Sequence, residues 1–357
     1  MKKKLLVLMM AFAMILAFAS CGGSGGGSEA EPEAAAEPNA GVGGIVFVLP
    51  DGWTVSGSSL EGYLEVTIPD SDYILYANIF GEDDLENVNR WNPEHGADSL
   101  EAYYEKNYKS EEALAKEGLE STPVKVCDTD ALYNKFKTES GGYIEAATTW
   151  MSDGEIYNIG LVNYDSYGED GKVNDDVTKL TDEEIATYED IVASIQPGDG
   201  TAIQKAALSA DSVGSIAFEA PAGYTLTAVY EDQITFTKDG SEVTLQFNVT
   251  HEDDLKNMTD SDGKHPESLQ EWYEQFLYEG IEETEIAGYK GHVDKWPAED
   301  ENYYNCSAEF LADDGIYNVY MGTDAWDEDG NIKEDAVSLT EDDMAVFDAF
   351  VASLKKK

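Results

Sequence analysis

The chain has 357 residues, and its 22 lysines and arginines stand against 73 aspartates and glutamates, a formal net charge of −51 at pH 7. So large a negative charge repels nucleic acid and anionic lipid headgroups, and it excludes functions that need a basic surface. Cations, basic proteins and neutral small ligands remain as partners. Most of the charge is expected to form a solvated coat that keeps the protein soluble.

Residues 1–20 have the pattern of a secretory signal. Three lysines precede the run LLVLMMAFAMILAF, and this apolar block of about 14 residues is too short to span a bilayer as a mature helix. The segment FASC, ending at Cys21, resembles the lipobox of bacterial lipoproteins, although Phe18 stands where leucine is more usual. The resemblance implies lipidation of Cys21 and anchoring on the extracytoplasmic face of the cell membrane. The alternative is an ordinary cleaved signal with an incidental cysteine.

Residues 21–43 contain glycine, serine, alanine, proline and glutamate but almost no large apolar side chain. Such a segment cannot bury a core, and we expect a flexible tether. Without residues 1–20 the chain keeps 19 basic residues, so its net charge becomes 19 − 73 = −54.

The rest of the chain is a tandem duplication. GEDDLENV at 81–88 returns as HEDDLKNM at 251–258, and LTDEEIATYEDIVASI at 180–195 returns as LTEDDMAVFDAFVASL at 339–354. These landmarks recur at a domain-sized separation rather than at the short period of a solenoid. We place a first repeat at 44–196, a linker at 197–212 that gives the repeats freedom, and a second repeat at 213–357.

In the first repeat, alternating apolar residues predict three early strands, which lie in 45–50, 61–69 and 73–80, with a turn at 70–72. A polar loop is expected next. Ser99 then caps a helix with an apolar stripe, and the second repeat carries the same stripe. The stripe residues are Leu100, Tyr103, Tyr104 and Tyr108 in the first repeat and Leu269, Trp272, Tyr273, Phe276 and Leu277 in the second.

Four antiparallel strands are predicted next in the first repeat, in 123–127, 131–138, 142–150 and 155–164, with turns at 140–142 and 152–154. A closing helix begins at Thr181, whose spacing to Glu184 fits a capping box. Its apolar face recurs in the second repeat. The face consists of Ile185, Tyr188, Val192 and Ile195, and then of Met344, Phe347, Val351 and Leu354.

This order of elements, the FxxPxGW-like start in FVLPDGW and FEAPAGY, and the final VASI or VASL resemble the Mog1/PsbP-like α/β sandwich. The resemblance covers both repeats and implies an α+β fold of two tandem antiparallel-sheet sandwich domains. That family includes photosystem extrinsic proteins, a nuclear-transport regulator and bacterial envelope lipoproteins, which work chiefly as binding and assembly modules. The resemblance therefore implies a non-enzymatic role without a cofactor.

The histidines and cysteines give no clear site. His95 and His265 lie 265 − 95 = 170 residues apart, just before the central helix of each repeat, and we expect a helix-entry or loop hydrogen bond from each. His251 and His292 have no matching histidine in the first repeat. Cys127 and Cys306 do not correspond either, and each is expected to be a small buried hydrophobe rather than half of a disulfide bond.

An acidic loop precedes each closing helix, at 165–176 and at 324–335. Clustered oxygen ligands suit calcium, and the candidate ligands in the second repeat are Asp324, Asp327, Asp329 and Asp335. The pattern fails as an EF-hand, because Ala325 and Ala336 take the first and last ligand positions. The alternatives are an irregular calcium site and a solvated acidic turn. The repeated EDDL is expected to close a loop with its side chains.

These patterns predict a lipid-anchored, extracytoplasmic binding or assembly module of the cell envelope. It would be anchored to the membrane through its N-terminal lipid. It would also bind an unknown protein or small ligand, and a cationic partner suits the negative charge of the chain. No nucleic acid is expected as a partner. A calcium-dependent surface or adhesion protein is the first alternative. An envelope hydrolase is the second, and it requires a cleft with a perturbed histidine or carboxylate.

Overall fold

The computed structural model describes residues 36–116, 118–167, 174, 176–258, 264–275, 283–298, 302–323, 325–326, 332–333 and 336–357. Pro38–Lys357 forms one compact unit, which contains both repeats. The signal segment and Cys21 lie outside the described residues. In the described part of the chain, no helix is long and apolar enough to cross a membrane.

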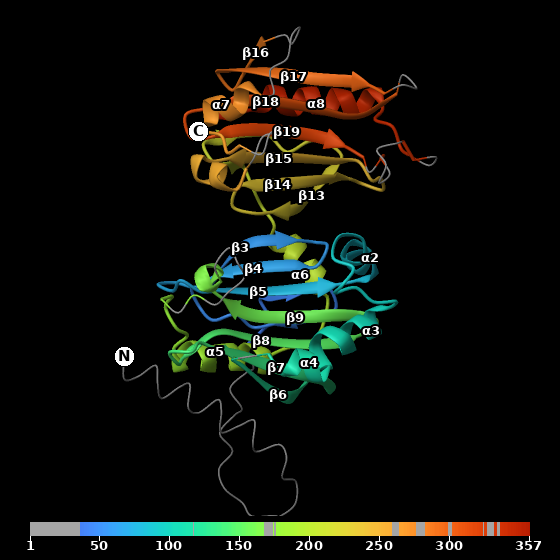
Figure 1. Cartoon of the computed structure of the whole chain (residues 1–357). Helices are drawn as coiled ribbons and strands as arrows, with labels where there is room; N and C mark the ends of the chain where they lie inside the picture. The colour runs from blue at the N-terminus through green and yellow to red at the C-terminus, as the bar shows by residue number, and fades with distance from the viewer. Residues whose placement is uncertain are drawn as a thin grey trace, which may run out of the picture. The chain divides into compact units, whose positions relative to one another are not determined.

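The first repeat is an antiparallel sheet with helices on its two faces (Figure 1). The hairpin turn between its last two strands is formed by Asp153 and Gly154, both at positive φ, as the predicted turn at 152–154 requires. The elements are β1 (Ala40–Val42), β2 (Ile45–Phe47), β3 (Thr54–Ser59), β4 (Tyr63–Thr67), β5 (Ile74–Phe80), α2 (Glu82–Trp91), α3 (Leu100–Tyr104), a π-helical turn (Glu105–Lys109), α4 (Glu111–Leu114), β6 (Leu119–Val126), β7 (Thr129–Lys137), β8 (Tyr143–Ser152), β9 (Glu155–Val162), a 3-10 turn (Tyr164–Ser166), α5 (Asp182–Ala193) and β10 (Gln196–Pro197).

The second repeat has the same order of elements after a connecting helix, α6 (Gly200–Ala207). The elements are β11 (Ser212–Val213), β12 (Ile216–Ala217), β13 (Tyr224–Val229), β14 (Gln233–Lys238), β15 (Thr244–Thr250), a 3-10 helix (Glu252–Asn257), α7 (Leu269–Glu274), β16 (Glu283–Ile286), β17 (Tyr289–Pro297), β18 (Tyr303–Leu311), β19 (Ile316–Gly322), α8 (Glu341–Ser353) and β20 (Lys355–Lys356).

The strands of the two repeats are arranged identically. The spatial order is β3-β4-β5-β9-β8-β7-β6 in the first repeat and β13-β14-β15-β19-β18-β17-β16 in the second. Every strand pair is antiparallel, as predicted, and β13 pairs with β3 through Ala228 with Ser59 and Val229 with Ser58. The protein is thus mainly antiparallel sheet, in an α+β sandwich arrangement.

A small second sheet joins the beginning of each repeat to its end. In the first repeat β2 lies between β1 and β10, and in the second β12 lies between β11 and β20. Strand β1 falls within the stretch 21–43 that the sequence predicts to be a tether. Its short apolar sequence AGV is buried, because it forms a hairpin with β2 and so contributes to the core.

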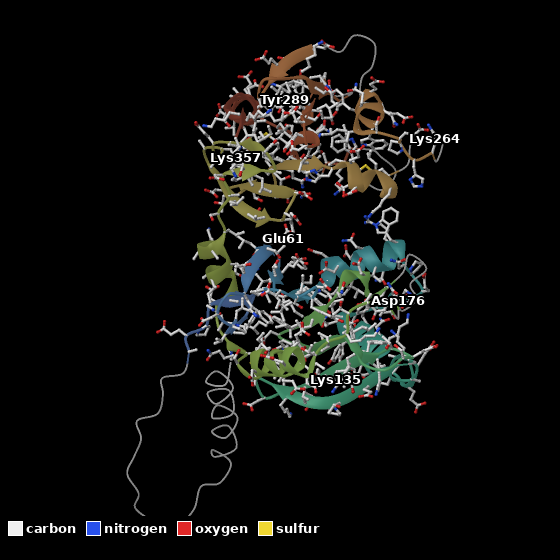
Figure 2. All side chains as sticks on the ribbon, turned by 90° about the vertical axis from the view of Figure 1, so that its left-hand side faces the viewer. Glu61, Lys135, Asp176, Lys264, Tyr289 and Lys357 are labelled. Carbon is white, nitrogen blue, oxygen red and sulfur yellow. The ribbon has the colours of Figure 1, made fainter. Side chains whose placement is uncertain are left out.

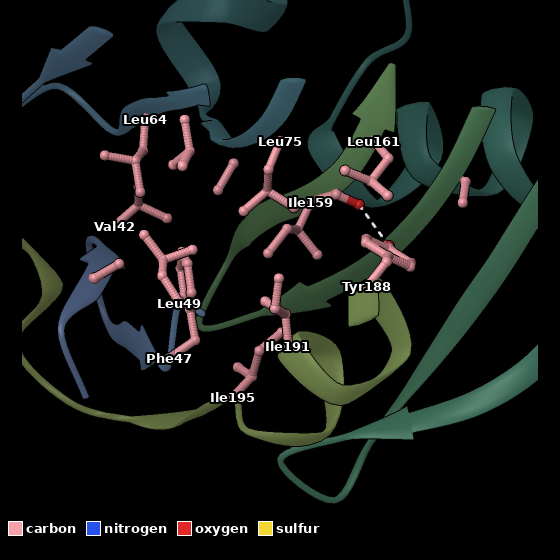
Figure 3. Packing of buried hydrophobic residues seen from close by; sticks show 14 of the residues in the cluster. Val42, Phe47, Leu49, Leu64, Leu75, Ile159, Leu161, Tyr188, Ile191 and Ile195 are labelled. Atoms are coloured by element: carbon pink, nitrogen blue, oxygen red, sulfur yellow. Dashed lines mark hydrogen bonds between the residues drawn. The ribbon is translucent and has the colours of Figure 1, made fainter. Parts of the chain in front are cut away.

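One face of each large sheet carries the main apolar core, which the closing helix and the small sheet cover. Figure 3 shows Phe47 of the small sheet with Tyr188 and Ile191 of α5 in the first repeat. The Tyr188 hydroxyl is fully buried and donates to Thr148 Oγ1 (2.7 Å) or the Ile159 carbonyl (2.8 Å). Phe347 takes the equivalent place in the second repeat, with no exposed surface. The predicted apolar faces of both closing helices are confirmed.

The opposite face is covered by the central helices. Leu100 and Tyr104 of α3 pack with Leu85 of α2 on Ile156 of β9, so the predicted aromatic stripe belongs to a core. Ser99 Oγ accepts from the Ala102 amide, which confirms the predicted cap. In the second repeat α7 buries Tyr273, while Phe276 and Leu277 lie outside the described residues.

The repeated EDDL segment starts a helix, so the prediction of a polar loop is wrong there. It opens α2 in the first repeat and the 3-10 helix in the second. The Asp84 carboxylate accepts from the Gly81 amide, and the Asp254 carboxylate accepts from the His251 amide, both at 2.7 Å. Carboxylates in the first turn accept hydrogen bonds from backbone amides that have no partner within the helix, and their negative charge interacts favourably with the positive end of the helix dipole. The motif is therefore a helix-starting device present in both copies.

The linker also contains structure that the sequence did not predict. Its helix α6 is fastened by Gln204, which is 2% exposed. The Gln204 amide nitrogen has two hydrogens to donate to three nearby acceptors, Ser58 Oγ (3.0 Å), the Ser59 carbonyl (3.2 Å) and the Tyr63 carbonyl (2.7 Å). A buried amide with these partners fixes the helix on β3 and β4.

Asp343 in the first turn of α8 is a buried carboxylate, 2% exposed. Burial raises its pKa, but hydrogen bonds from Lys238, Thr340 and Tyr224 outweigh this effect and lower the pKa to about 2. The Lys238 ammonium lies 2.7 Å from the Asp343 carboxylate. The capping box predicted for Thr181 with Glu184 is present in the first repeat, and Thr340 with Asp343 is its counterpart.

We predict that Asp343→Asn lowers the free energy of unfolding at pH 7 by about 3 kcal/mol, because Lys238 loses its buried partner. The ordinary aspartate pKa is about 3.9, so the stabilisation is present above that pH and is lost as the pH falls toward 2. Urea unfolding between pH 7 and pH 2.5 measures both effects. Glu184→Gln is the control, because Glu184 occupies the same capping position in the first repeat but accepts from the neutral Ser71 and Thr181 hydroxyls. If Asp343→Asn unfolds with the same pH dependence as the parent protein, Asp343 is not the source of the loss of stability in acid.

Candidate functional site

A small polar pocket opens in the first repeat on the sheet face that the central helices cover. Its volume is about 120 Å³. Both the sheet strands and the segment from the π-helical turn to β6 contribute its walls. The lining residues are Tyr76, Asn107, Tyr108, Ala113, Lys116, Leu119, Asn134, Phe136, Glu145, Ala147, Thr149 and Asn158.

Glu145 on β8 is the carboxylate of this pocket. It accepts a hydrogen bond from the Tyr167 hydroxyl at 2.8 Å. Burial raises its pKa, and the Tyr167 hydrogen bond and the nearby Lys116 charge offset only part of that effect. A half-buried carboxylate with one neutral hydrogen-bond donor is incompletely compensated, so a cationic or hydrogen-bond-donating group placed beside it gains free energy.

Amide side chains form the floor of the pocket. Asn158 donates to the Tyr76 hydroxyl at 3.1 Å and accepts from Thr149 Oγ1 at 3.2 Å. The Asn134 amide oxygen is buried and has no hydrogen-bond partner among the described residues. Such an orphaned oxygen costs free energy in the empty protein. An additional donor in the pocket would remove that cost.

Aromatic rings complete the walls. Tyr108 packs against Tyr104 with 5.6 Å between the ring centroids, and burial raises the pKa of Tyr108 to about 12. Its hydroxyl is therefore protonated near neutral pH and is available as a hydrogen-bond donor rather than as a nucleophile. The pocket thus combines apolar faces with a few polar groups, as small-molecule sites commonly do.

The second repeat fills the equivalent part of its sheet with an ion cluster. Leu132 and Thr149, paired across β7 and β8, correspond to His292 and Glu309, paired across β17 and β18. His292 has no exposed surface, and its Nε2 atom lies 3.1 Å from Glu309 Oε2 and 3.6 Å from Asp294 Oδ2.

Two further side chains hold this cluster in place. The Tyr273 hydroxyl is 3.3 Å from His292 Nδ1, and Asn318 donates to Glu309 at 2.7 Å. The contact of His292 with Glu309 has an ion-pair separation without the geometry of a hydrogen bond. Tyr273 matches Tyr104 in the repeat alignment, and the same helix position contacts the Thr149 carbonyl in the first repeat and the His292 ring in the second.

Sequence reasoning missed both arrangements. His292 was set aside because no histidine corresponds to it, and Glu145 carries no motif. An alignment of the two repeats strand by strand contains the signal, since it places His292 over Leu132 and Asn305 over Glu145. Those differences lie on the one sheet face that both repeats bury under the central helix.

The four calcium candidates Asp324, Asp327, Asp329 and Asp335 all lie outside the described residues. In the first repeat, Asp72, Asp165 and Asp176 border an open hollow of about 680 Å³ beside the corresponding loop. The Asn163 and Asn174 side chains there accept from nearby backbone amides and close turns. The described residues contain no group of three or more histidine, cysteine, aspartate or glutamate side chains arranged to hold a metal ion.

The other histidines make local contacts. His265 Nδ1 is 2.7 Å from the Met258 carbonyl, the loop hydrogen bond expected for it. His95 is exposed, and its carbonyl accepts from the Asn107 side chain. His251 lies between the Asp314 carbonyl and the Asp232 carboxylate. Burial lowers the pKa of His251, but these two hydrogen bonds outweigh it and raise the pKa.

The two cysteines are free. Cys306 is buried in the second core, as expected of a small hydrophobe. Cys127 is exposed, so the same expectation is wrong for it. It forms the hairpin turn between β6 and β7 with Asp128, both at positive φ, and a tight turn projects its side chains to the surface.

A second hollow of about 180 Å³ lies between α6, β1 and β3. Gln204 contributes to its wall, and its amide nitrogen lies within hydrogen-bond distance of three oxygens of β3 and β4. Its amide oxygen, like that of Asn134, has no hydrogen-bond partner among the described residues, but this hollow contains no charged side chain.

Charged side chains lie on the surface of both repeats. Figure 2 labels Asp176 in the first repeat and Lys264 in the second, both of which are exposed.

We predict that His292→Leu lowers the free energy of unfolding by about 2 kcal/mol, because the largely buried Glu309 carboxylate then loses the imidazole that lies 3.1 Å from it. Adding Glu309→Thr recreates the Leu132 and Thr149 pair of the first repeat and should restore most of the loss. A double-mutant cycle by chemical denaturation measures the coupling. If the single variant is as stable as the parent, the cluster contributes no ion pair.

Comparisons with known proteins assign no family to the chain: no family model matches it, and no curated protein matches it. Similar solved structures include a protein from Bacteroides thetaiotaomicron VPI-5482, which is 11% identical with a TM-score of 0.20 and covers 49% of this chain. The alignment spans about half of that protein, 48% of its length. The Tle4–Tli4 complex is 10% identical with a TM-score of 0.27 and covers 85% of this chain and 97% of that one. These are distant bacterial neighbours, and no function is transferred from them.

Proposed function

We propose that the protein is a lipid-anchored extracytoplasmic binding protein with two Mog1/PsbP-like domains, whose first repeat binds a small polar ligand. The site is the pocket between the central helices and the sheet, with Glu145, Asn134 and Asn158 in its walls. The proposal treats the second repeat as a copy in which the ion cluster around His292 has taken the place of that site.

The observation that supports ligand binding is the uncompensated polarity of the pocket. Glu145 is half-buried with a raised pKa, and the amide oxygen of Asn134 has no partner among the described residues. Groups of this kind reduce the stability of the empty protein. A wall that only had to pack against a helix would contain apolar residues, as the neighbouring cluster of Leu85, Leu100 and Ile156 does.

Binding is favoured over catalysis by the partners of Glu145. A hydrolase needs an activated nucleophile within hydrogen-bond reach of its general base. The hydroxyl that contacts Glu145 belongs to Tyr167, and burial together with the Glu145 charge raises the pKa of that tyrosine. It therefore donates a proton to a hydrogen bond at neutral pH and does not attack. The proposed role is accordingly non-enzymatic.

The envelope location rests on the N-terminal sequence. The lysine-rich start, the short apolar run and FASC ending at Cys21 have the layout of a lipoprotein signal. The Gly/Ser/Ala/Glu/Pro segment that follows provides a tether between a lipid at Cys21 and Pro38–Lys357. The assignment of the two repeats to Mog1/PsbP-like domains rests on their shared strand order and closing helices.

We predict that Cys21→Ala abolishes lipidation, because no other residue supplies the thiol at the signal boundary. Metabolic labelling with an alkyne fatty acid, followed by cell fractionation, measures the effect. The parent chain should be labelled and pellet with membranes, while the variant should be unlabelled and keep its signal sequence. Equal labelling and equal membrane retention of Cys21→Ala would contradict the anchor.

We predict that a small polar metabolite raises the thermal midpoint of Pro38–Lys357 and that Ala147→Met removes the shift by filling the pocket. A ligand at a hundred times its dissociation constant adds about 2.7 kcal/mol, which moves the midpoint by several degrees. The panel comprises amino acids, simple amines, carboxylic acids, sugars and polyols. Ser307→Met is the matched control, since Ser307 on β18 corresponds to Ala147 on β8. A ligand whose shift survives Ala147→Met binds elsewhere and would overturn the assignment of the pocket.

A further inference from the structure

Two opposite charges line the same small pocket without meeting. Glu145 lies half-buried on β8, and Lys116 lies exposed after α4. The Lys116 charge reaches Glu145 strongly enough to influence its pKa. Both residues are described, and no ion pair joins them at 4.0 Å or less. The pocket therefore offers separate binding positions for a cation and an anion.

We infer that the pocket takes a small zwitterion, with an ammonium group against Glu145 and a carboxylate against Lys116. This inference rests on the proposed ligand-binding function and specifies the class of ligand. An ammonium group donates three hydrogen bonds and carries the charge that compensates Glu145. A carboxylate at the mouth meets the exposed lysine ammonium as a point charge.

The remaining wall suits the body of such a molecule. Tyr76, Tyr108 and Phe136 present ring surfaces to short aliphatic groups, and an aromatic face also stabilises a nearby ammonium. Asn134 supplies an amide oxygen that has no partner among the described residues. The volume of about 120 Å³ is well below the roughly 300 Å³ at which drug-sized sites begin, so only a small molecule fits.

The charge arrangement favours a zwitterion over two simpler ligand classes. A plain carboxylate that lies near Glu145 is repelled by the like charge. If it lies near Lys116 instead, it leaves the inner wall of the pocket without a ligand group. A plain amine satisfies Glu145 but leaves the second charge of the pocket unused. The preference for a zwitterion over a plain amine is therefore the distinguishing property of the site.

The test is isothermal titration of Pro38–Lys357 with glycine, L-alanine, β-alanine and γ-aminobutyrate, compared with ethylamine and propionate at constant ionic strength. We expect at least one zwitterion to bind about tenfold or more tightly than both single-charge analogues, since each charge-assisted hydrogen bond contributes about that factor or more. Glu145→Gln and Lys116→Met should each weaken the zwitterion about tenfold or more.

Two matched variants control for the general charge of the protein. Glu242→Gln and Lys256→Met remove exposed charges of the same kind in the second repeat and should leave the affinity unchanged. Ethylamine bound as tightly as the zwitterions, or an affinity insensitive to Lys116→Met, would overturn the zwitterion inference while keeping the pocket as a cation site. A sugar or polyol that binds in the Ala147-dependent manner would also overturn it but would keep the proposed function. No pocket-dependent binding by any class would overturn both.

Discussion

Burial of both faces of one antiparallel sheet is the constraint on which each repeat depends. The main core face is mostly apolar, with the Tyr188 and Thr148 hydroxyls paired inside it, and the closing helix and the small sheet pack on it. In the first repeat the other face is covered by short helices, because a π-helical turn separates α3 from α4. Among the described residues of that face, the apolar cluster lies around Leu85 and Ile156. Beside this cluster the face carries polar side chains, which include Asn134, Glu145 and Asn158.

The two repeats resolve this constraint differently. The second repeat brings the polar groups of this face together, with His292 close to Glu309 and Asn318 donating to Glu309, although His292 Nε2 itself has no hydrogen bond among the described residues. The first repeat leaves Glu145 and Asn134 facing a pocket whose polar groups lack full compensation. Duplication of a stable fold permits this difference, because the main core and strand order are kept in both copies. Change is concentrated on the face where packing is least complete.

Much of the fold could be predicted from sequence, because local signals agree with the final structure. Ser99, Thr181 and Thr340 cap helices where their spacing indicates, and Asp153 with Gly154 turns the chain as expected. Strand β3 was missed since TVSGSS has no apolar alternation, and its pairing with β4 and β13 supplies the order that its sequence lacks. Helix α2 was missed because it contains just three apolar residues, Leu85, Val88 and Trp91, of which only Leu85 is buried.

The candidate site was harder to predict for a different physical reason. Its walls come from β5, from the consecutive strands β7, β8 and β9, and from the segment between the π-helical turn and β6, and no local spacing indicates that Tyr76, Asn134 and Asn158 share a pocket. Only the pairing register brings them together. The electrostatic character of the pocket depends on how deeply Glu145 is buried, and that depth cannot be derived from amino-acid composition.

The small sheets affect how readily a repeat can be added to or removed from such a chain. Since β10 pairs with β2 and β20 pairs with β12, the chain enters and leaves each repeat at neighbouring strands. A copy can therefore be spliced in or removed without breaking a strand of the large sheet, provided that a short connector such as α6 follows it. Each added copy would bring its own closed core and one more sheet face whose covering is separate from that core.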